Sequence, residues 1–465
     1  MQSAESSARS DAHIDRGAWS WALFELARNP YALLCIIYVL APYIAKDVIG
    51  DPVRGQATIA LWQTIAGVLV ALTAPFLGAA ADRMGHRKPL LALVIVVMIP
   101  AVLIQYWALP NGAGLPIWAL ATAVIVAGVG YAWTEVIHNS MLSVAAKPRL
   151  ISAVSGLGLS LGNAGGVLLL LFVLWAFALP GQLPIPGVPP KPLFGLDPEK
   201  FEPIRIVAPI CAVWLVALSL PLFLWTPDRN ATGEGVLTAL RRGVVGMLET
   251  LRRLRTHGNV TTFLVARMFY VDGVTAIVIF AGVYVAGILG WQPIERLAFG
   301  VTLSIFASFG GLASAFLDAR VGAKMAVAIE IAVTLAMLIV QVSISPTQIL
   351  FIVPTDPSEN VWGGPVFETA SEVAYVLASI VIAISITASY ASSRALMAQL
   401  TPPKMEGEVF GLYALAGSAT AWLAPLLVRT FTSAFASQRV GFGSIGILLV
   451  AGFALLQFVK PPARS

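Results

Sequence analysis

The sequence predicts an all-α polytopic membrane protein with twelve transmembrane helices in two pseudo-symmetric six-helix bundles. The first observation behind this prediction is composition. Of 465 residues, 58% are hydrophobic and 11% are charged, whereas soluble domains carry about 25% charged residues. The second is an apolar run that recurs twelve times, each near the roughly 20 residues that cross a bilayer as a helix. The third is a basic connection that divides these runs into two sets of six.

The twelve runs are expected to be helices because backbone groups in lipid must form hydrogen bonds within their own segment. They lie near residues 18–45, 57–81, 89–109, 115–137, 150–178, 204–226, 259–287, 296–317, 324–345, 368–392, 404–431 and 440–459. With this topology, 19 of the 29 Lys and Arg residues lie on the side of the chain ends and 8 on the other side. The positive-inside rule then places both ends in the cytoplasm. The net charge of +5 follows from topology, and no nucleic-acid partner is expected.

The chain divides into five predicted parts. These are a cytoplasmic tail (1–16), an N-terminal six-helix bundle (17–225), a cytoplasmic linker (226–258), a C-terminal six-helix bundle (259–460) and a second cytoplasmic tail (461–465). The first tail lacks the apolar core of a signal peptide. In the linker, apolar residues at helical spacing alternate with arginines, which predicts an amphipathic helix that binds anionic membrane lipid.

A short polar seam between the second and third runs carries a specific pattern. Gly78 allows two helices to approach closely, Gly85 permits a sharp turn, and Asp82, Arg83 and Arg87 supply charge. This G-x-x-x-D-R-x-G-x-R-K pattern resembles the loop 2–3 signature of the major facilitator superfamily. The resemblance implies that the Asp and Arg latch the two halves together on the cytoplasmic side. The alternative is a turn whose cations only follow topology.

Glu135, near the end of the fourth run, is expected to pair with an arginine of this latch. His138 follows three residues later and is expected to be a solvated loop residue. In the second half, Ser314, Asp318 and Gly322 echo the seam with a different spacing. Such a weak internal repeat is typical of two related six-helix halves.

Buried charges mark the candidate site. Glu25 and Arg28 share one helix face in the first run and can pair. Arg267, Tyr270 and Asp272 lie within about 8 Å along the axis of the seventh run, which is the repeat partner of the first. Charges at this depth usually face a bundle interior or an aqueous cavity, so we expect the two sets to face each other across a central cavity. The alternative is an ion network that only holds the halves in register.

Three polar residues complete the predicted cavity: Gln63, Asn163 and Glu372. The fifth run also carries Gly158, Gly162, Gly165 and Gly166, which form a smooth face for close helix packing. This glycine set resembles the helix 5 signature of facilitator-superfamily antiporters, but Asn163 stands where a Pro is usual. Packing is the favoured interpretation of these glycines.

Four stretches resemble the autophagy-related vacuolar effluxer branch of the superfamily. They are HNSML after the fourth run, the glycine-rich fifth run, FLVARMFYVDG in the seventh, and the segment 392–427. The fungal members of this branch are associated with amino-acid efflux from the vacuole. The branch commonly has Asp-Trp-Ala-Asn-Ser in helix 1, where this chain has Glu25 to Asn29. Arg28 adds a charge there, so the resemblance does not carry the substrate over.

These observations predict a secondary active transporter that moves a small amphoteric solute, an amino acid or peptide-like compound, by alternating access. No nucleotide-binding loop occurs in the sequence, so an ion gradient, most simply of protons, is expected to drive it. Glu25, Asp272 and Glu372 are the candidate proton carriers. The first alternative is an efflux pump for amphipathic compounds or lipids.

A less favoured alternative is a non-transporting sensor or an embedded enzyme. Only four His residues occur, and none is predicted to form a catalytic or metal-binding set within a span, so no enzyme activity, metal or cofactor is expected. We expect a monomer in a bacterial inner membrane.

Overall fold

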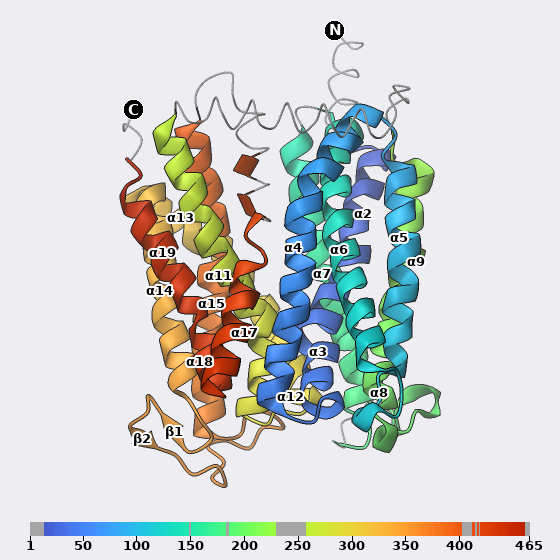
Figure 1. The fold of residues 1–465 in the computed structure, drawn as a ribbon, viewed down its shortest axis with the longest axis vertical. Helices are drawn as coiled ribbons and strands as arrows, with labels where there is room; N and C mark the ends of the chain where they lie inside the picture. The colour runs from blue at the N-terminus through green and yellow to red at the C-terminus, as the bar shows by residue number, and fades with distance from the viewer. Residues whose placement is uncertain are drawn as a thin grey trace.

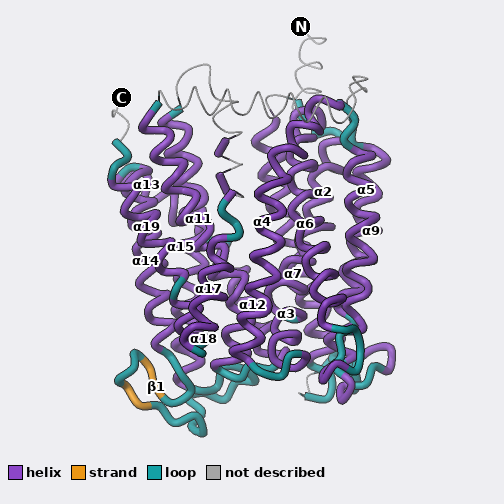
Figure 2. Tube along the Cα trace, in the orientation of Figure 1, coloured by secondary structure: helices purple, strands orange, loops and turns teal. Residues whose placement is uncertain are grey.

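The computed structural model describes residues 14–147, 150–182, 186–228, 257–401, 412–413, 416–417 and 419–460. Helices make up nearly all of it, and the only strands among these residues form one small hairpin (Figure 2). Eleven described segments are long and apolar enough to cross a membrane, and a shorter apolar helix, Leu423–Phe435, lies where the eleventh of the twelve predicted helices was expected. The predicted all-α polytopic membrane fold is confirmed.

The N-terminal half contains six spans. They are Arg16–Val48, built from α2 (Arg16–Tyr31), η1 (Ala32–Tyr38), α3 (Leu40–Tyr43) and η2 (Ile44–Val48); α4 (Pro52–Met84); α5 (Lys88–Leu103) with η3 (Ile104–Trp107); α6 (Ile117–Ala145); α7 (Ile151–Val173) with η6 (Leu174–Ala178); and α8 (Glu202–Arg205) with α9 (Val207–Trp225). Short 3-10 turns, η4 (Pro110–Gly112), η7 (Leu193–Gly195) and η8 (Pro198–Lys200), lie in the connections.

The C-terminal half follows a similar plan. Its helices are α11 (Gly258–Ile288), α12 (Pro293–Ala307) with α13 (Gly310–Val321), α14 (Ala323–Ser343), α15 (Ala370–Leu400), α17 (Leu423–Phe435), and α18 (Gln438–Gly443) with α19 (Ile445–Gln457). The strands β1 (Gln348–Ile349) and β2 (Val353–Pro354) pair antiparallel between α14 and α15. Residues 420–422 form a turn directly before α17.

The two halves stand side by side in Figure 1. The start of α2 and the end of α19 lie at one end of the molecule, which we call the tail end, and the β1–β2 hairpin and α8 lie at the other, the hairpin end. This agrees with an even number of spans. The predicted linker helix falls within residues 229–256, and both predicted tails fall largely within 1–13 and 461–465, all outside the described residues.

Hydrogen bonds between the halves gather at the hairpin end. The Gln56 amide nitrogen donates to the Thr432 hydroxyl at 2.8 Å and to the Gln438 carbonyl at 3.0 Å. The Lys46 ammonium donates to the Gly290 carbonyl at 3.4 Å. Gln56 and Thr432 are fully buried. The described structure therefore joins its halves near the hairpin, and the ribbons of the halves diverge toward the tail end (Figure 1).

Glycines set the approach of α2 to α7. A Cβ atom on Gly165 would lie 2.6 Å from the Leu26 carbonyl oxygen, and one on Gly166 would overlap the Leu33 side chain. Cβ atoms on Gly158 and Gly162 would lie 3.1 Å from the Trp21 ring and 3.3 Å from Glu25 Cβ. These close approaches agree with a packing face on the fifth span, and they hold the helix that carries Glu25.

Two glycines end matching helices of the halves. Gly85 follows α4 with φ of 81°, and Gly322 follows α13 with φ of 82°. Residues other than glycine rarely adopt a positive backbone φ, so glycine is suited to both turns. The turn expected of Gly85 in the seam is thus present, and Gly322 repeats it in the second half.

Candidate functional site: a buried charge cluster in the N-terminal half

The cluster begins on α2, where Glu25 and Arg28 point to the same side. Asp15 caps the start of this helix by accepting from the Ala18 amide at 2.8 Å. Glu25 Oε2 and Arg28 Nη2 are 3.1 Å apart, and the exposed fractions of the two side chains are 16% and 7%. The structure therefore forms the ion pair that the three-residue spacing predicts, and it buries the pair inside the bundle.

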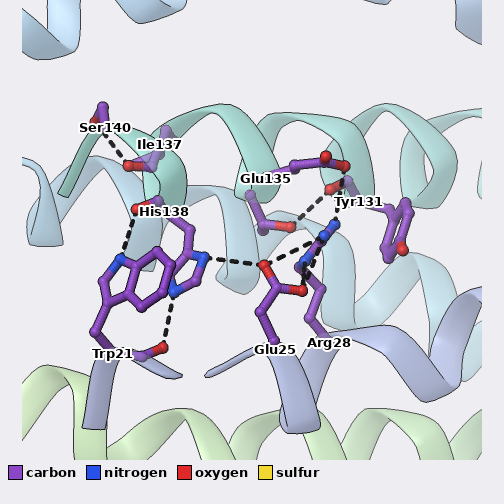
Figure 3. Close-up of polar contacts among 9 residues, drawn as sticks. Trp21, Glu25, Arg28, Tyr131, Glu135, Ile137, His138 and Ser140 are labelled. Carbon is purple, nitrogen blue, oxygen red and sulfur yellow. Dashed lines mark hydrogen bonds and ion pairs between the residues drawn. The ribbon is translucent and has the colours of Figure 1, made fainter. Parts of the chain in front are cut away.

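His138 joins this pair from α6, as Figure 3 shows. Its Nδ1 lies 3.1 Å from Glu25 Oε1, and its Nε2 lies 2.8 Å from the Trp21 carbonyl oxygen. The Trp21 indole donates in return to the His138 carbonyl at 2.8 Å, and the two rings stack with centroids 4.2 Å apart. His138 is completely buried. Two backbone-anchored contacts and a stacked ring thus fix the imidazole against Glu25.

The prediction that His138 is a solvated loop residue is wrong. The apolar run ends near residue 137, but α6 continues to Ala145, so His138 lies on a helix inside the bundle. The extension begins with three polar residues, His138 to Ser140, so hydropathy alone did not predict it. The three-residue spacing from Glu135 to His138 is that of one helical face, and it is the local sign that both side chains lie on the same side of a continued helix.

The network continues from Arg28 to the edge of the N-terminal half. Arg28 Nη1 lies 3.3 Å from Glu135 Oε2, and half of the Glu135 side chain is exposed. The guanidinium also lies over the Tyr131 ring, 4.6 Å from its centroid. Tyr390 of α15, in the other half, lies within electrostatic range of Glu135. The cluster therefore reaches from a buried histidine to a partly exposed carboxylate that faces the C-terminal half.

We expected Glu135 to pair with an arginine of the latch. Its ion pair among the described residues is with Arg28. The side chains of Gly78, Asp82 and Arg83 lie outside the described residues. Arg87 is buried, and its backbone amide donates to Asp228 at 3.0 Å. The latch itself stays a prediction.

In the C-terminal half, Arg267 and Asp272 are both buried, and their side chains form hydrogen bonds with residues 413 and 424, before and at the start of α17, instead of with each other. Arg267 Nη1 donates to the Tyr413 carbonyl at 2.8 Å, and its guanidinium lies 3.6 Å from the centroid of the Tyr413 ring. Asp272 Oδ2 accepts from the Ala424 amide at 3.0 Å, at the first turn of α17. These two charges flank the turn at residues 420–422 that precedes α17.

The other predicted cavity residues have varied surroundings. The Tyr270 hydroxyl is buried and lies 2.6 Å from that of Ser393. Glu372 caps α15 by accepting from the Thr369 amide at 3.1 Å, and it also accepts from the Trp291 indole at 2.8 Å. Asn163 is exposed on α7.

Gln63 lines a small enclosed cavity inside the N-terminal half, beside Tyr31 and Gln105. The predicted set is thus distributed over several environments. The residues that converge are Glu25, Arg28, Glu135 and His138. Among the described residues, no group of three His, Cys, Asp or Glu side chains has the arrangement of a metal site.

Comparison with known proteins identifies the family. The family model described as "Vacuole effluxer Atg22 like" matches residues 46–462. The chain belongs to this family. A curated relative, the uncharacterized MFS-type transporter YxiO of Bacillus subtilis (strain 168), is 20% identical over 459 residues, covering 95% of this chain and 94% of the relative. The chain is therefore an MFS transporter and a multi-pass integral membrane protein.

Solved structures agree on the fold. The nucleoside transporter NupG superposes with a TM-score of 0.63 at 14% identity, covering 96% of this chain and 98% of that one. The D-xylose-proton symporter gives 0.65 at 10% identity, covering 96% and 97%. A bacterial homologue of the human lysosomal transporter Spinster, inward-facing and unoccupied, gives 0.60 at 15% identity, covering 96% and 95%. At these identities the likeness concerns the fold alone.

Proposed function

We propose that this chain is a secondary active transporter that works by alternating access and couples the movement of a small amphoteric solute, an amino acid or peptide-like compound, to protons. The contact between Glu25 and His138 carries this proposal. The Trp21 carbonyl can only accept a hydrogen bond, so the Nε2 atom that faces it carries a hydrogen. The 3.1 Å contact between Nδ1 and Glu25 then needs one further proton, on the imidazole or on the carboxyl.

Arg28 links this proton to the exposed edge of the cluster. Its guanidinium contacts both Glu25 and Glu135, and a cation beside a carboxylate favours the charged form of that carboxylate. A solute that draws Arg28 or Glu135 toward itself changes the charge that surrounds the contact between Glu25 and His138. This linkage is the physical basis of the proposed coupling.

Mixed charge suits an amphoteric solute. The N-terminal half offers the half-exposed Glu135 carboxylate to an ammonium group. In the C-terminal half, the hydroxyl groups of Tyr390 and Thr275 are hydrogen-bonded at 3.0 Å, and Tyr390 lies within electrostatic range of both Glu135 and Arg267. Groups of both signs therefore lie near the boundary of the two halves. Hydrogen bonds between the halves at the hairpin end support a state that is open toward the cytoplasm.

The test begins with a thermal-shift screen of the purified protein against amino acids, dipeptides and amphipathic amines, because a bound ligand raises apparent stability. The compound with the largest shift is then radiolabelled and followed in proteoliposomes. An imposed pH gradient should drive its accumulation by the wild type. Glu25→Gln and His138→Gln should retain solute exchange without a gradient but lose gradient-driven accumulation.

The matched control is Glu199→Gln, an exposed carboxylate in the connection between α7 and α9, which should behave as the wild type does. Uptake that ignores the pH gradient, together with full activity of Glu25→Gln and His138→Gln, would remove proton coupling. A thermal shift from amphipathic amines alone would replace the amphoteric solute by an amphipathic one.

A further inference from the structure

A second polar cluster lies in the C-terminal half, between α13, α14 and α15, and the site above does not use it. Glu330 on α14 is buried, with 3% of its surface exposed. Its Oε1 accepts from the Ser392 hydroxyl of α15 at 3.0 Å. Ser392 Oγ in turn lies 3.0 Å from the Ser314 hydroxyl of α13. Both serines are buried, so three helices meet around one carboxyl group.

The hydrogen bonds of this cluster run in one direction, from Ser314 through Ser392 to Glu330. A serine hydroxyl carries one hydrogen, and that of Ser392 goes to Glu330, so Ser314 donates to Ser392. The chain of donors therefore ends at Glu330 Oε1 and leaves Oε2 without a partner. Oε2 is fully enclosed, and so is Asp318 Oδ1, which also has no hydrogen-bond partner. A buried acceptor without a donor is costly, so both atoms point to a missing hydrogen.

The charges of this cluster have the same sign. Asp318 lies one helical turn after Ser314 on α13, and its negative charge repels that of Glu330. Among the described residues, no Lys, Arg or His lies within 4 Å of either carboxylate. Two like charges in a low-dielectric interior are strongly disfavoured. A proton on one carboxyl removes this repulsion.

The neighbouring cations are engaged elsewhere. Arg320 lies over the Phe316 ring at 3.8 Å, and Lys324 at the start of α14 donates to the Gln457 carbonyl at 3.1 Å. Arg394 of α15 is exposed, and Arg439 of α18 donates to the Ile344 carbonyl near the hairpin end. The fourth helix packed on α14, α19, has no titratable side chain.

We propose that Glu330 and Asp318 form a proton-binding site in the C-terminal half, with Ser392 and Ser314 as its hydrogen-bond donors. Ser392 is followed by Ser393, whose hydroxyl lies 2.6 Å from that of Tyr270 on α11. The site thus shares a helix with residues near the boundary of the halves, and its occupancy can affect the position of α15. Only this coupling role depends on the proposed function, since proton binding itself needs no solute.

The test is infrared difference spectroscopy of the purified protein between about pH 5 and about pH 9, a range that covers a carboxyl shifted from its usual titration. The wild type should show the carbonyl band of a protonated carboxyl that disappears as pH rises. Glu330→Gln should lose this band and release one proton fewer in a parallel potentiometric titration. Asp356→Asn, in the exposed loop after the hairpin, is the control and should leave the band unchanged.

Two further variants should shift the band in opposite directions. Asp318→Asn removes a like charge, so the remaining carboxyl ionises more easily and the band should vanish at lower pH. Ser392→Ala removes a donor to the ionised carboxylate, so the band should persist to higher pH. In each variant, the pH at which the band disappears should shift by about one pH unit, a tenfold change in proton concentration.

The two variants keep the test decisive if Glu330→Gln does not fold. An unchanged band in Glu330→Gln, or shifts of Asp318→Asn and Ser392→Ala in the same direction, would overturn the site. A band that responds as expected in a protein whose solute uptake ignores a pH gradient would confirm proton binding and remove its coupling role. The failure of the proposed function is thus distinct from the failure of this site.

Discussion

The two halves of this protein treat their buried charges differently. In the N-terminal half, Glu25 and Glu135 both form side-chain ion pairs with Arg28. In the C-terminal half, Arg267 and Asp272 are buried, and each contacts a backbone group, the Tyr413 carbonyl and the Ala424 amide, on either side of the turn before α17. The first arrangement can exchange partners when a solute or proton arrives. The second stabilises the ends of a discontinuous span.

Buried charges that look alike in the sequence therefore have different roles in the two halves. Helix dipoles leave partial positive charge at an N-terminus, and α17 has no capping side chain of its own. Asp272 supplies that cap from α11. Asp272 is bound to the backbone of another span, whereas Glu25, Arg28 and Glu135 contact one another through side chains, so the proposed coupling is placed in the N-terminal cluster.

The largest expected effect is a difference in stability between variants of Arg28 and of Arg267. Arg28→Met leaves the buried Glu25 without its main counter-charge, and breaking a buried ion pair on one side typically costs about 3 to 5 kcal/mol. Arg267→Met should cost less, because no described carboxylate lies within 4 Å of Arg267 and the variant also removes a buried charge. Apparent Tm of the purified variants measures the difference.

A double variant checks the reason for this effect. Glu25→Gln combined with Arg28→Met removes both charges, so it should recover much of the stability lost by Arg28→Met alone. Equal losses for Arg28→Met and Arg267→Met, with no recovery in the double variant, would contradict the contrast between the halves.

The second effect concerns the cap of α17. Asp272→Leu leaves the Ala424 amide without an acceptor and should cost about 1.5 to 3 kcal/mol, the range for hydrogen bonds to charged groups. Asp272→Asn retains an acceptor and should lose less. Hydrogen exchange of amides 423–426, measured by mass spectrometry, should rise in Asp272→Leu and only slightly in Asp272→Asn.

The matched control for this prediction is Asp51→Leu. Asp51 caps α4 from within its own chain segment, through the Arg54 amide at 2.7 Å. This variant should raise exchange at the start of α4 and leave residues 423–426 unchanged. Unaltered exchange at 423–426 in Asp272→Leu would show that α17 does not need the cap.

Most of the fold was predictable because lipid imposes a simple rule on the sequence. Apolar runs of sufficient length must be helices, and eleven described segments satisfy it. Helix ends were less predictable, since polar turns extend α6 beyond the apolar run. The turn before α17 was not predicted at all. It is accompanied by Asp272, which lies 152 residues before Ala424 in the chain, so local composition carries no sign of it.

The site was predictable only where partners are close in sequence. The pairing of Glu25 with Arg28 follows from helical spacing. The contacts of Glu25 with His138 and of Arg28 with Glu135 depend on how α2 packs against α6, which no local pattern specifies. Glu372 is a different case, because Thr369 and Glu372 form the S/T-x-x-E pattern of a capping box, and the structure contains that box. Its role as a cap was readable from the sequence.

The smallest expected effect is on stability, at the two matching turns that follow α4 and α13. Gly85 and Gly322 have φ values of 81° and 82°, where a Cβ atom crowds the backbone and costs roughly 1 to 2 kcal/mol. Gly85→Ala and Gly322→Ala should therefore lower apparent Tm by similar amounts. Gly156→Ala, a helical glycine whose added Cβ would meet no atom within 4 Å, should not lower it. If Gly85 also belongs to a latch between the halves, Gly85→Ala should slow solute exchange in proteoliposomes more than Gly322→Ala does. Equal exchange rates at equal stability would mean that both turns only connect helices.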